Sequence, residues 1–361
     1  MVRKSKSTKI VSFVHGYGDH IKIQQGPKPA LVRLKQGDDP EYFKFVFPRN
    51  VEEFDDLEYQ IIGEMPLSSA VNFNTLPRFG LTGLWCTRKN IFAGSWNGIY
   101  KLRKEDLSVE AFITNRLMND LHGIFVNESL IISVLTGKDT IVLSDHHGKI
   151  KKTIRINQDL SLNYDEDELL EHDWRFLSKQ FRGATGYFHM NYVQLFGDTL
   201  WLTSRNIGAF IVLRIGDYRA KLRTINHKTP VCLHDGILAD NEFLFTSIDG
   251  KILLVSDPRK TGYNPREKMD NLEFFERDLV SEVIRLNETE LNYYPNWCRG
   301  IVKTKKGYAV TIDGRYDTDL SFKILEIDKC GGIIALDRIE WAAITEESDV
   351  RYVTGFDIDL I

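Results

Sequence analysis

Several sequence features are missing, and each absence removes a class of protein. No apolar run reaches the ~20 residues that a helix needs to cross a bilayer. The basic N-terminal residues lead into a short apolar stretch, IVSFV, without the longer apolar core of a secretory signal. The net charge of −4 gives no reason to expect a basic surface for nucleic acid. We therefore expect a cytoplasmic protein whose partners include neither nucleic acid nor membrane.

Cysteine is also scarce. The four cysteines, Cys86, Cys232, Cys298 and Cys330, are scattered and show neither CxxC nor Cys/His spacing. Such spacing would mark a disulfide framework or a zinc site. The cysteines are therefore predicted to be buried free thiols among apolar strand residues.

A repeated unit is what the chain does contain. Each copy has a small or polar entry, an apolar strand, a turn, a second strand, a glycine-containing turn and a third strand. The copies begin at Leu81, Leu121, Phe188, Leu233 and Cys298. Turn pairs such as Asn97-Gly98 tolerate the positive φ angles of tight hairpins. Repeated hairpins without βα alternation indicate the blades of an antiparallel β-propeller.

The two ends of the chain complete the ring in this interpretation. The last segment, VTGFDIDLI, resembles the LTGLWC that opens the first copy, but only one strand is present there. The other strands must come from the N-terminal segment, which contains KIVSFV, ALVRL and EYFKFVF. We predict an all-β fold with one domain over residues 1–361. It is a six-bladed β-propeller of four-stranded antiparallel blades, with one blade shared between the termini and short helical insertions. Five or seven blades are the alternatives, because residues 1–80 are the least repetitive part.

Two insertions interrupt the repeat, at residues 157–187 and 257–296. The first has apolar residues among acids, and the second contains NLEFFERDLVSEVIRL, with apolar residues at helical spacing. Both precede the first strand of a copy, so short helices are predicted on the face where the innermost strands begin. They are candidate lids over the channel mouth, and surface decoration is the alternative.

Polar side chains open the first strands of the copies. If these strands are innermost, their opening residues meet at one mouth of the central channel. These residues are His122, His189, Asn191, His234, Asp235 and Arg299. Imidazoles can act as nucleophile or general base, and a guanidinium and an amide can hold an oxyanion. A divalent metal held by the imidazoles is an alternative, and so is a channel that holds only water.

Two short motifs resemble the bacterial arylsulfate sulfotransferases. HMN at residues 189–191, followed by SRN at 204–206, is similar to the His-x-Asn and Ser-Arg pattern of that family. LHD at residues 233–235 is similar to its Gln-His-Asp segment. The resemblance covers about two blades and implies a six-bladed propeller in which His234 accepts a sulfuryl group from a phenolic sulfate. It also implies that His122, His189, Asn191 and Arg205 hold the sulfate oxygens, and that no cofactor is required.

Three functions are compatible with these residues. The first is an enzyme that transfers a sulfuryl or similar anionic group, acting on an anionic, phenolic or sugar-like small molecule. Its catalytic residues would be His234, His189 and His122, and its substrate-binding residues Asn191, Arg205, Arg299 and Asp235. The second is a metal-dependent lyase or hydrolase, with the metal ligands unknown. The third is a non-catalytic propeller that binds a ligand or a protein partner.

Overall fold

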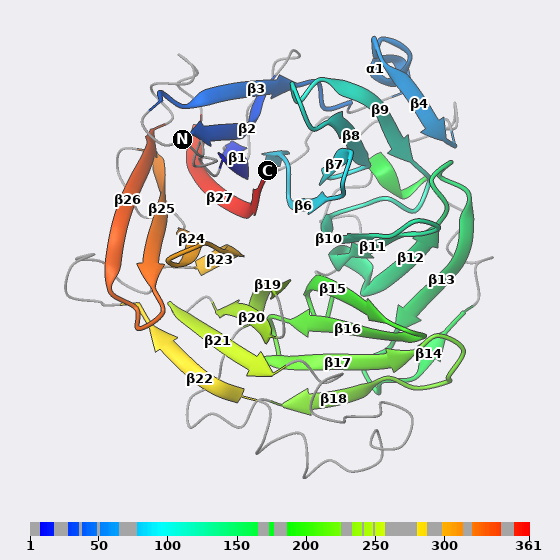
Figure 1. Cartoon of the computed structure of the whole chain (residues 1–361). Helices are drawn as coiled ribbons and strands as arrows, with labels where there is room; N and C mark the ends of the chain where they lie inside the picture. Colours follow the sequence, from blue (N-terminus) through cyan, green and yellow to red (C-terminus); the bar gives the residue numbers. More distant parts are fainter. Residues whose placement is uncertain are drawn as a thin grey trace.

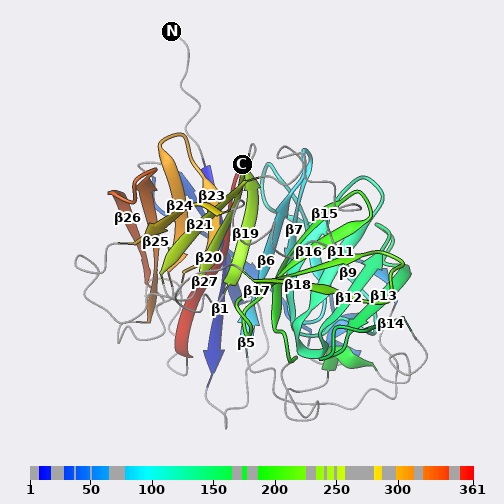
Figure 2. The same ribbon diagram turned by 90° about the horizontal axis from the view of Figure 1, so that it is seen from below.

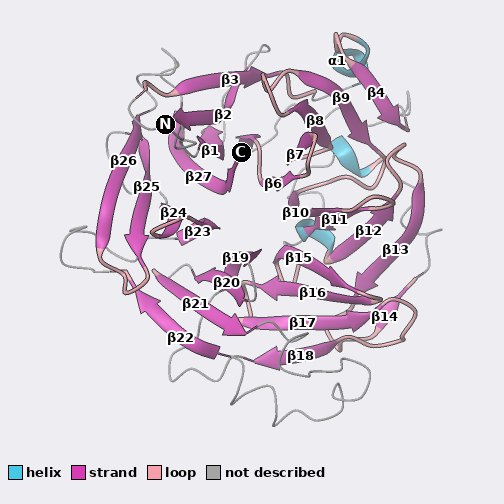
Figure 3. Cartoon of the chain, in the orientation of Figure 1, coloured by secondary structure: helices cyan, strands magenta, loops and turns pink. Residues whose placement is uncertain are grey.

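The computed structural model describes fourteen segments of the chain. They are residues 8–17, 28–35, 38–48, 51–64, 78–164, 173–176, 186–224, 233–239, 242–247, 250–256, 280–286, 298–312, 320–340 and 350–361. Strands dominate these segments, and the short helical turns are α1 (Val51–Asp55), η1 (Thr136–Lys138) and η2 (Trp174–Phe176) (Figure 3). Within the described segments, no helix is long and apolar enough to span a membrane. The all-β prediction is confirmed.

The described strands form six sheets arranged radially about a common axis (Figure 1), and each is named here after its innermost strand. The β27 sheet holds β27 (Val350–Leu360), β1 (Thr8–Tyr17), β2 (Lys28–Lys35) and β3 (Glu41–Phe45), with β5 (Arg78–Gly80) paired to β1. The β6 sheet holds β6 (Gly83–Cys86), β7 (Asn90–Gly94), β8 (Ile99–Arg103), β9 (Val109–Thr114) and β4 (Gln60–Gly63). The β10 sheet holds β10 (Leu121–Val126), β11 (Ile131–Leu135), β12 (Thr140–Ser144), β13 (Ile150–Ile156) and β14 (Leu162–Asn163).

The other three sheets each have four described strands. The β15 sheet holds β15 (Met190–Phe196), β16 (Thr199–Ser204), β17 (Ala209–Arg214) and β18 (Lys221–Thr224). The β19 sheet holds β19 (Leu233–Ala239), β20 (Glu242–Ser247), β21 (Lys251–Ser256) and β22 (Val280–Arg285). The β23 sheet holds β23 (Cys298–Lys303), β24 (Gly307–Ile312), β25 (Ser321–Asp328) and β26 (Ile333–Glu340). Figure 2 shows β19, β27 and β6 lying along the axis.

The two ends of the chain meet in the β27 sheet, as the sequence predicts. β27 pairs antiparallel with β1, from Lys9 opposite Leu360 to Tyr17 opposite Val350. The prediction of four antiparallel strands in every blade is wrong in detail, because three sheets have a fifth described strand. One of these, β4, pairs parallel with β9.

One described part of the second insertion is a strand where the pattern predicts a helix. Residues 280–285 form strand β22, which pairs with β21. Their β-branched valines and isoleucine favour a strand, and pairing along the open edge of β21 overrides the helical spacing. In the first insertion, residues 162–163 form β14 and residues 174–176 form a 3₁₀ turn. The predicted helical parts at residues 165–172, 177–185, 257–279 and 287–296 lie outside the described residues.

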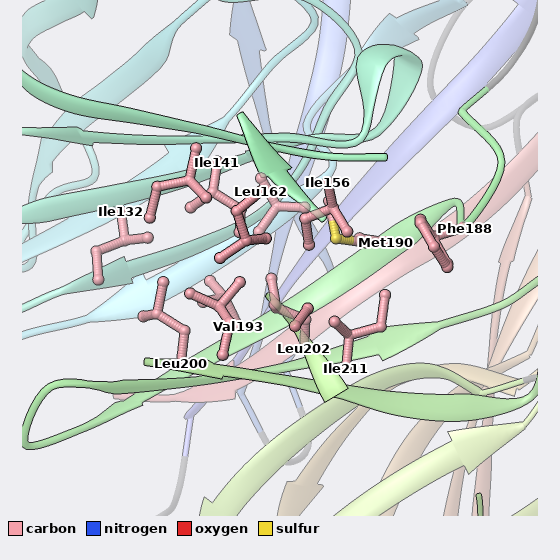
Figure 4. Close-up of a cluster of buried hydrophobic side chains, with 14 of the residues drawn as sticks. Ile132, Ile141, Ile156, Leu162, Phe188, Met190, Val193, Leu200, Leu202 and Ile211 are labelled. Atoms are coloured by element: carbon pink, nitrogen blue, oxygen red, sulfur yellow. The ribbon is translucent and has the colours of Figure 1, made fainter. Parts of the chain in front are cut away.

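Apolar side chains fill the spaces between neighbouring sheets. Figure 4 shows the layer between the β10 and β15 sheets, where Ile132, Ile141 and Ile156 face Val193 and Leu202. Aromatic rings join the β15 and β19 sheets, with the ring centroids of Phe210 and Phe245 4.5 Å apart. This contact pattern explains nearly continuous apolar strands such as IISVL at residues 131–135, since each sheet buries both faces against its neighbours.

Four innermost strands slip in register against the strand beside them. The pairing shifts between Leu121 and Gly123, Met190 and Val193, Leu233 and Gly236, and Cys298 and Ile301. A bulge of this kind re-aims side chains and leaves backbone groups without their usual ladder partners. Those backbone groups are buried, so they need other partners.

Threonines on the second strands supply these partners. The Thr203 hydroxyl accepts from the Tyr192 N–H at 3.1 Å and donates to the His234 carbonyl of the next sheet at 3.0 Å. The Thr246 hydroxyl likewise accepts from the Asp235 N–H at 3.3 Å and donates to the Arg299 carbonyl. Each hydroxyl therefore spans a bulge and ties two sheets together.

We expect Thr203→Val to lower the free energy of unfolding by about 2 kcal/mol, because two buried backbone groups lose their partner. Thr153→Val is the matched control: the Thr153 hydroxyl is buried and has no hydrogen-bond partner among the described residues. Urea denaturation should show the loss in the first variant alone. Equal stability of the two variants would contradict the bridging role of Thr203.

Candidate functional site

Five of the seven predicted site residues lie at the bulges of the innermost strands, and His189 and Arg205 do not. His122 falls within the shift on β10, Asn191 within that on β15, His234 and Asp235 within that on β19, and Arg299 within that on β23. All five are at most 8% exposed. The bulges explain how polar side chains leave the alternating apolar pattern of these strands and turn toward the axis.

His189 does not share the repeat position of the other histidines. It precedes β15 and has φ +50°, and the corresponding residue before β10 is Asp120, with φ +53°. In the β15 sheet, Asn191 occupies the repeat position that His122 occupies in the β10 sheet. The expectation that His189 opens its strand in the same way as His122 and His234 is therefore wrong, because the left-handed entry residue is His189 itself in the β15 sheet and Asp120 in the β10 sheet.

A buried carboxylate holds the backbone around His189. Asp139 accepts from the N–H groups of Phe188 at 3.1 Å and of His189 at 3.2 Å. Burial raises the pKa of Asp139 to about 6, although these N–H groups oppose the rise. The Arg205 N–H donates to the His189 carbonyl at 3.2 Å, which places Arg205 beside this entry.

The structure brings His122 to His189 and His234 to Arg299. The His122 and His189 rings meet edge to face, with centroids 5.2 Å apart. Arg299 Nη1 lies 2.7 Å from His234 Nε2. Burial lowers the pKa of His234 well below its usual value, and the positive charges that Arg299, His122, His189 and Arg205 carry when protonated lower it further. Residues far apart in sequence therefore share one electrostatic environment.

The hydrogen bonds assign the imidazole protons. A guanidinium only donates, so His234 Nε2 must accept, and neutral His234 carries its proton on Nδ1. His122 Nδ1 lies 3.0 Å from the Asp120 carbonyl oxygen, which only accepts. Neutral His122 therefore has its proton on Nδ1 and its lone pair on Nε2.

Among these residues, Asn191 gives the strongest indication of a ligand-binding site. It is 2% exposed, and among the described residues neither its amide oxygen nor its amide nitrogen has a hydrogen-bond partner. A buried amide in this condition costs about 1–3 kcal/mol. Such a cost is expected where a ligand completes the hydrogen bonds.

A cavity of about 250 Å³ adjoins this group along the axis. His122, Asp235 and Asp357 line it together with apolar residues. Burial raises the pKa of Asp235, and the neighbouring Asp357 carboxylate raises it further. Burial raises the pKa of Asp357 to about 7, against the N–H groups of Leu84 and Ile358, which donate at 2.7 and 2.8 Å. The two carboxyl groups are hydrogen-bonded, so they share a proton near neutral pH.

Sequence reasoning missed Asp357. The repeat aligns its segment with LTGLWC, where no acid occurs, and Asp357 shares its strand with a second acid, Asp359. The close approach of the Asp357 backbone on β27 to β23 depends on a glycine, since a Cβ on Gly300 would lie 2.5 Å from Asp357 Cα. In the same way, a Cβ on Gly123 would lie 2.0 Å from the Asn191 carbonyl oxygen.

Comparisons with known proteins identify the architecture. No known protein family and no curated protein sequence matches this chain. A solved nidogen/laminin complex is similar at 8% identity, covering 97% of this chain and 98% of that chain with a TM-score of 0.51. The chain folds as a β-propeller.

Two further solved structures are similar at a lower score. A catalytically inactive virginiamycin B lyase from Staphylococcus aureus with quinupristin has 12% identity, covers 73% of this chain and 70% of that chain, and has a TM-score of 0.41. A computationally designed protein, Ika8, has 8% identity, coverage of 90% and 87%, and a TM-score of 0.39. At these identities the propeller likeness concerns the fold alone, and the arylsulfate sulfotransferase resemblance stays a prediction.

The remaining predictions concern cysteines and metal. Cys298 is buried as predicted, whereas Cys86 is partly exposed and Cys330 is exposed in the turn after β25; none of these three forms a disulfide. Cys232 lies outside the described residues. Within the described segments, no three His, Cys, Asp or Glu side chains are arranged to hold a metal ion. The metal-dependent alternative stays untested.

We expect His234 to make the folded protein sensitive to acid. The unfolded chain protonates this residue near its ordinary pKa of 6.5, whereas the folded protein resists protonation. Below pH 6.5 the unfolded state therefore binds more protons, and the free energy of unfolding falls.

His234→Gln should remove this fall, which is at most about 1.4 kcal/mol per pH unit. Urea denaturation between pH 5 and 7.5 measures the slope, and His147→Gln, in an exposed turn, is the control. A His234→Gln slope equal to that of the wild type would show that the imidazole ionises freely in the fold.

Proposed function

We propose that the protein binds a small anionic ligand at the mouth of the propeller channel, with Asn191, Arg205 and Arg299 as donors. The six described sheets are the six blades of one closed ring in this proposal. The observation that carries it is the buried Asn191 amide, which has no partner among the described residues, beside a group that contains two arginines. Guanidinium and amide groups together match the oxygens of a sulfate, phosphate or carboxylate.

The charge of the mouth favours an anion. Arginine keeps its positive charge at all ordinary pH values, whereas burial and the neighbouring cations keep His234 neutral. Arg299 is 3% exposed, so its charge acts in a medium less polar than water. An anion there would lower the cost of burying this guanidinium.

Part of the first insertion supports its proposed role as a lid. The Trp174 N–H donates to the Arg116 carbonyl at 2.7 Å, and the Asn119 amide donates to the Trp174 carbonyl. Lys138 Nζ lies 4.5 Å from the centroid of the Trp174 ring. Residues 173–176 therefore pack on the loop that leads into β10 and His122, and we propose that these four residues cover part of the mouth.

Histidine-assisted group transfer is a second candidate, favoured by neutral imidazoles beside arginines. An imidazole nitrogen would attack the sulfur of a phenolic sulfate, the S–O bond would break and the phenolate would leave with the electron pair. A second phenol would then attack the sulfur, release its proton to solvent and break the N–S bond. Attack by Nε2 of His234 requires its hydrogen bond from Arg299 to open first. Nε2 of His122 carries the lone pair in the neutral tautomer.

The Asn191→Leu substitution should have opposite effects on ligand affinity and on the stability of the fold. We expect it to weaken sulfate binding at least about tenfold, because a donor is lost. It should also raise the free energy of unfolding of the ligand-free protein by about 1 kcal/mol, because a buried amide without a partner is removed. Isothermal titration with sulfate and urea denaturation measure the two effects.

Arg103→Ala, at an exposed arginine on β8, should change neither quantity. The anion-binding proposal is contradicted if the wild type does not bind sulfate at millimolar concentration, or if Asn191→Leu binds it as tightly as the wild type. Either outcome would favour the alternative of a propeller that binds a protein partner.

Group transfer predicts that the protein releases 4-nitrophenolate from 4-nitrophenyl sulfate and that phenol accelerates the release. Mass spectrometry should identify phenyl sulfate as the product. His234→Gln should abolish the reaction if this residue is the nucleophile, and His147→Gln should leave it unchanged. Sulfate binding without any release of 4-nitrophenolate would limit the function to binding.

A further inference from the structure

One histidine of the basic group and three acids line the axial cavity. His122 lines it, and so do Asp235, Asp357 and Asp359. His234 and Asp235 are neighbours in one bulge. The His234 imidazole meets Arg299, whereas the Asp235 carboxyl is hydrogen-bonded to Asp357 and also interacts with the Arg299 charge. A single strand, β19, therefore contributes one residue to the basic group and another to the acidic wall.

The carboxyl pair places negative charge on the cavity wall. Asp357 accepts from the N–H groups of Leu84 and Ile358, which fix its two oxygens, and it is hydrogen-bonded to Asp235. The pair shares a proton, and its negative charge grows as the pH rises through about 7. Since both side chains sit among apolar residues, this charge is only partly hydrated.

The remaining wall suits an organic ligand better than water alone. Its apolar residues are Leu84, Trp85, Ile124, Ile237, Ile301 and Ile358. The volume of about 250 Å³ is several times the ~30 Å³ that one water occupies in the liquid. Tyr192 adds a buried hydroxyl, which donates to the Gln194 amide oxygen at 3.0 Å. An apolar chain can therefore lie along the wall between the two charged regions.

We infer that the ligand of this channel is zwitterionic, with its anionic group at Asn191 and the arginines and an ammonium group at the Asp235–Asp357 pair. This inference rests on the proposed anion-binding function and narrows its ligand class. The ammonium group offsets the negative charge of the carboxyl pair, and the anionic group offsets the positive charge of the arginines. The bound ligand therefore compensates the buried charge at both of its ends. The bulge on β19 couples the two ends, because it supplies His234 to one and Asp235 to the other.

Matched pairs of probes test the inference by isothermal titration. Taurine and homotaurine carry a sulfonate and an ammonium, and ethanesulfonate and propanesulfonate lack only the amine. We expect at least one aminosulfonate to bind the wild type about tenfold or more tightly than the alkanesulfonate of equal length. The two spacer lengths sample different separations of the two ends.

The double variant Asp235→Asn/Asp357→Asn should bind each aminosulfonate no more tightly than its matched alkanesulfonate. Asp106→Asn, at an exposed carboxylate, should keep the wild-type preference. If the alkanesulfonates bind the wild type and neither amine adds affinity, the zwitterion inference is overturned while anion binding stands. If none of the four probes binds, the proposed function itself fails. The wild-type comparison decides between these outcomes even if the double variant does not fold.

Discussion

The close approach of neighbouring innermost strands is the constraint on which the rest of the structure depends. Gly123 and Gly300 let one strand touch the backbone of the next, and any side chain at these positions would collide with it. Threonine hydroxyls such as Thr203 then bond across the same gap. The residues held in this way include Asn191 and His234, so the contacts that close the ring also place the polar groups.

The bulges of the innermost strands place the polar side chains of the candidate site. A regular strand would bury alternate residues between sheets, and polar side chains would have to avoid those positions. The register shift adds residues that have no partner in the ladder, and these are the positions of His122, Asn191, His234 and Arg299. The backbone cost is small, because threonine hydroxyls replace the lost hydrogen bonds. The four sheets that contribute supply between one and three groups each, so the site exists only when the sheets are assembled.

The sequence predicts the repeated hairpins, the all-β fold and the joining of the two ends, because these follow from period, alternation and turn residues. It also predicts that His122, His189, His234 and Arg299 converge. It does not predict the exact register, since the repeat spacing does not show that His189, like Asp120, is the left-handed residue before its strand and not the first polar residue within it. The sequence also does not predict Asp357 as a site residue. Its role depends on burial and on contact with Asp235, which lies 122 positions away in sequence (357 − 235).

The central claim is that donors from separate sheets meet to bind one anion. The most direct measurement is a crystal of the protein soaked in selenate, whose selenium gives an anomalous signal. We predict a selenium peak with its oxygens about 3 Å from Asn191 Nδ2 and the Arg299 guanidinium, and loss of that peak in Asn191→Leu crystals. Selenium peaks confined to the outer surface, with none at the channel mouth, would contradict the account.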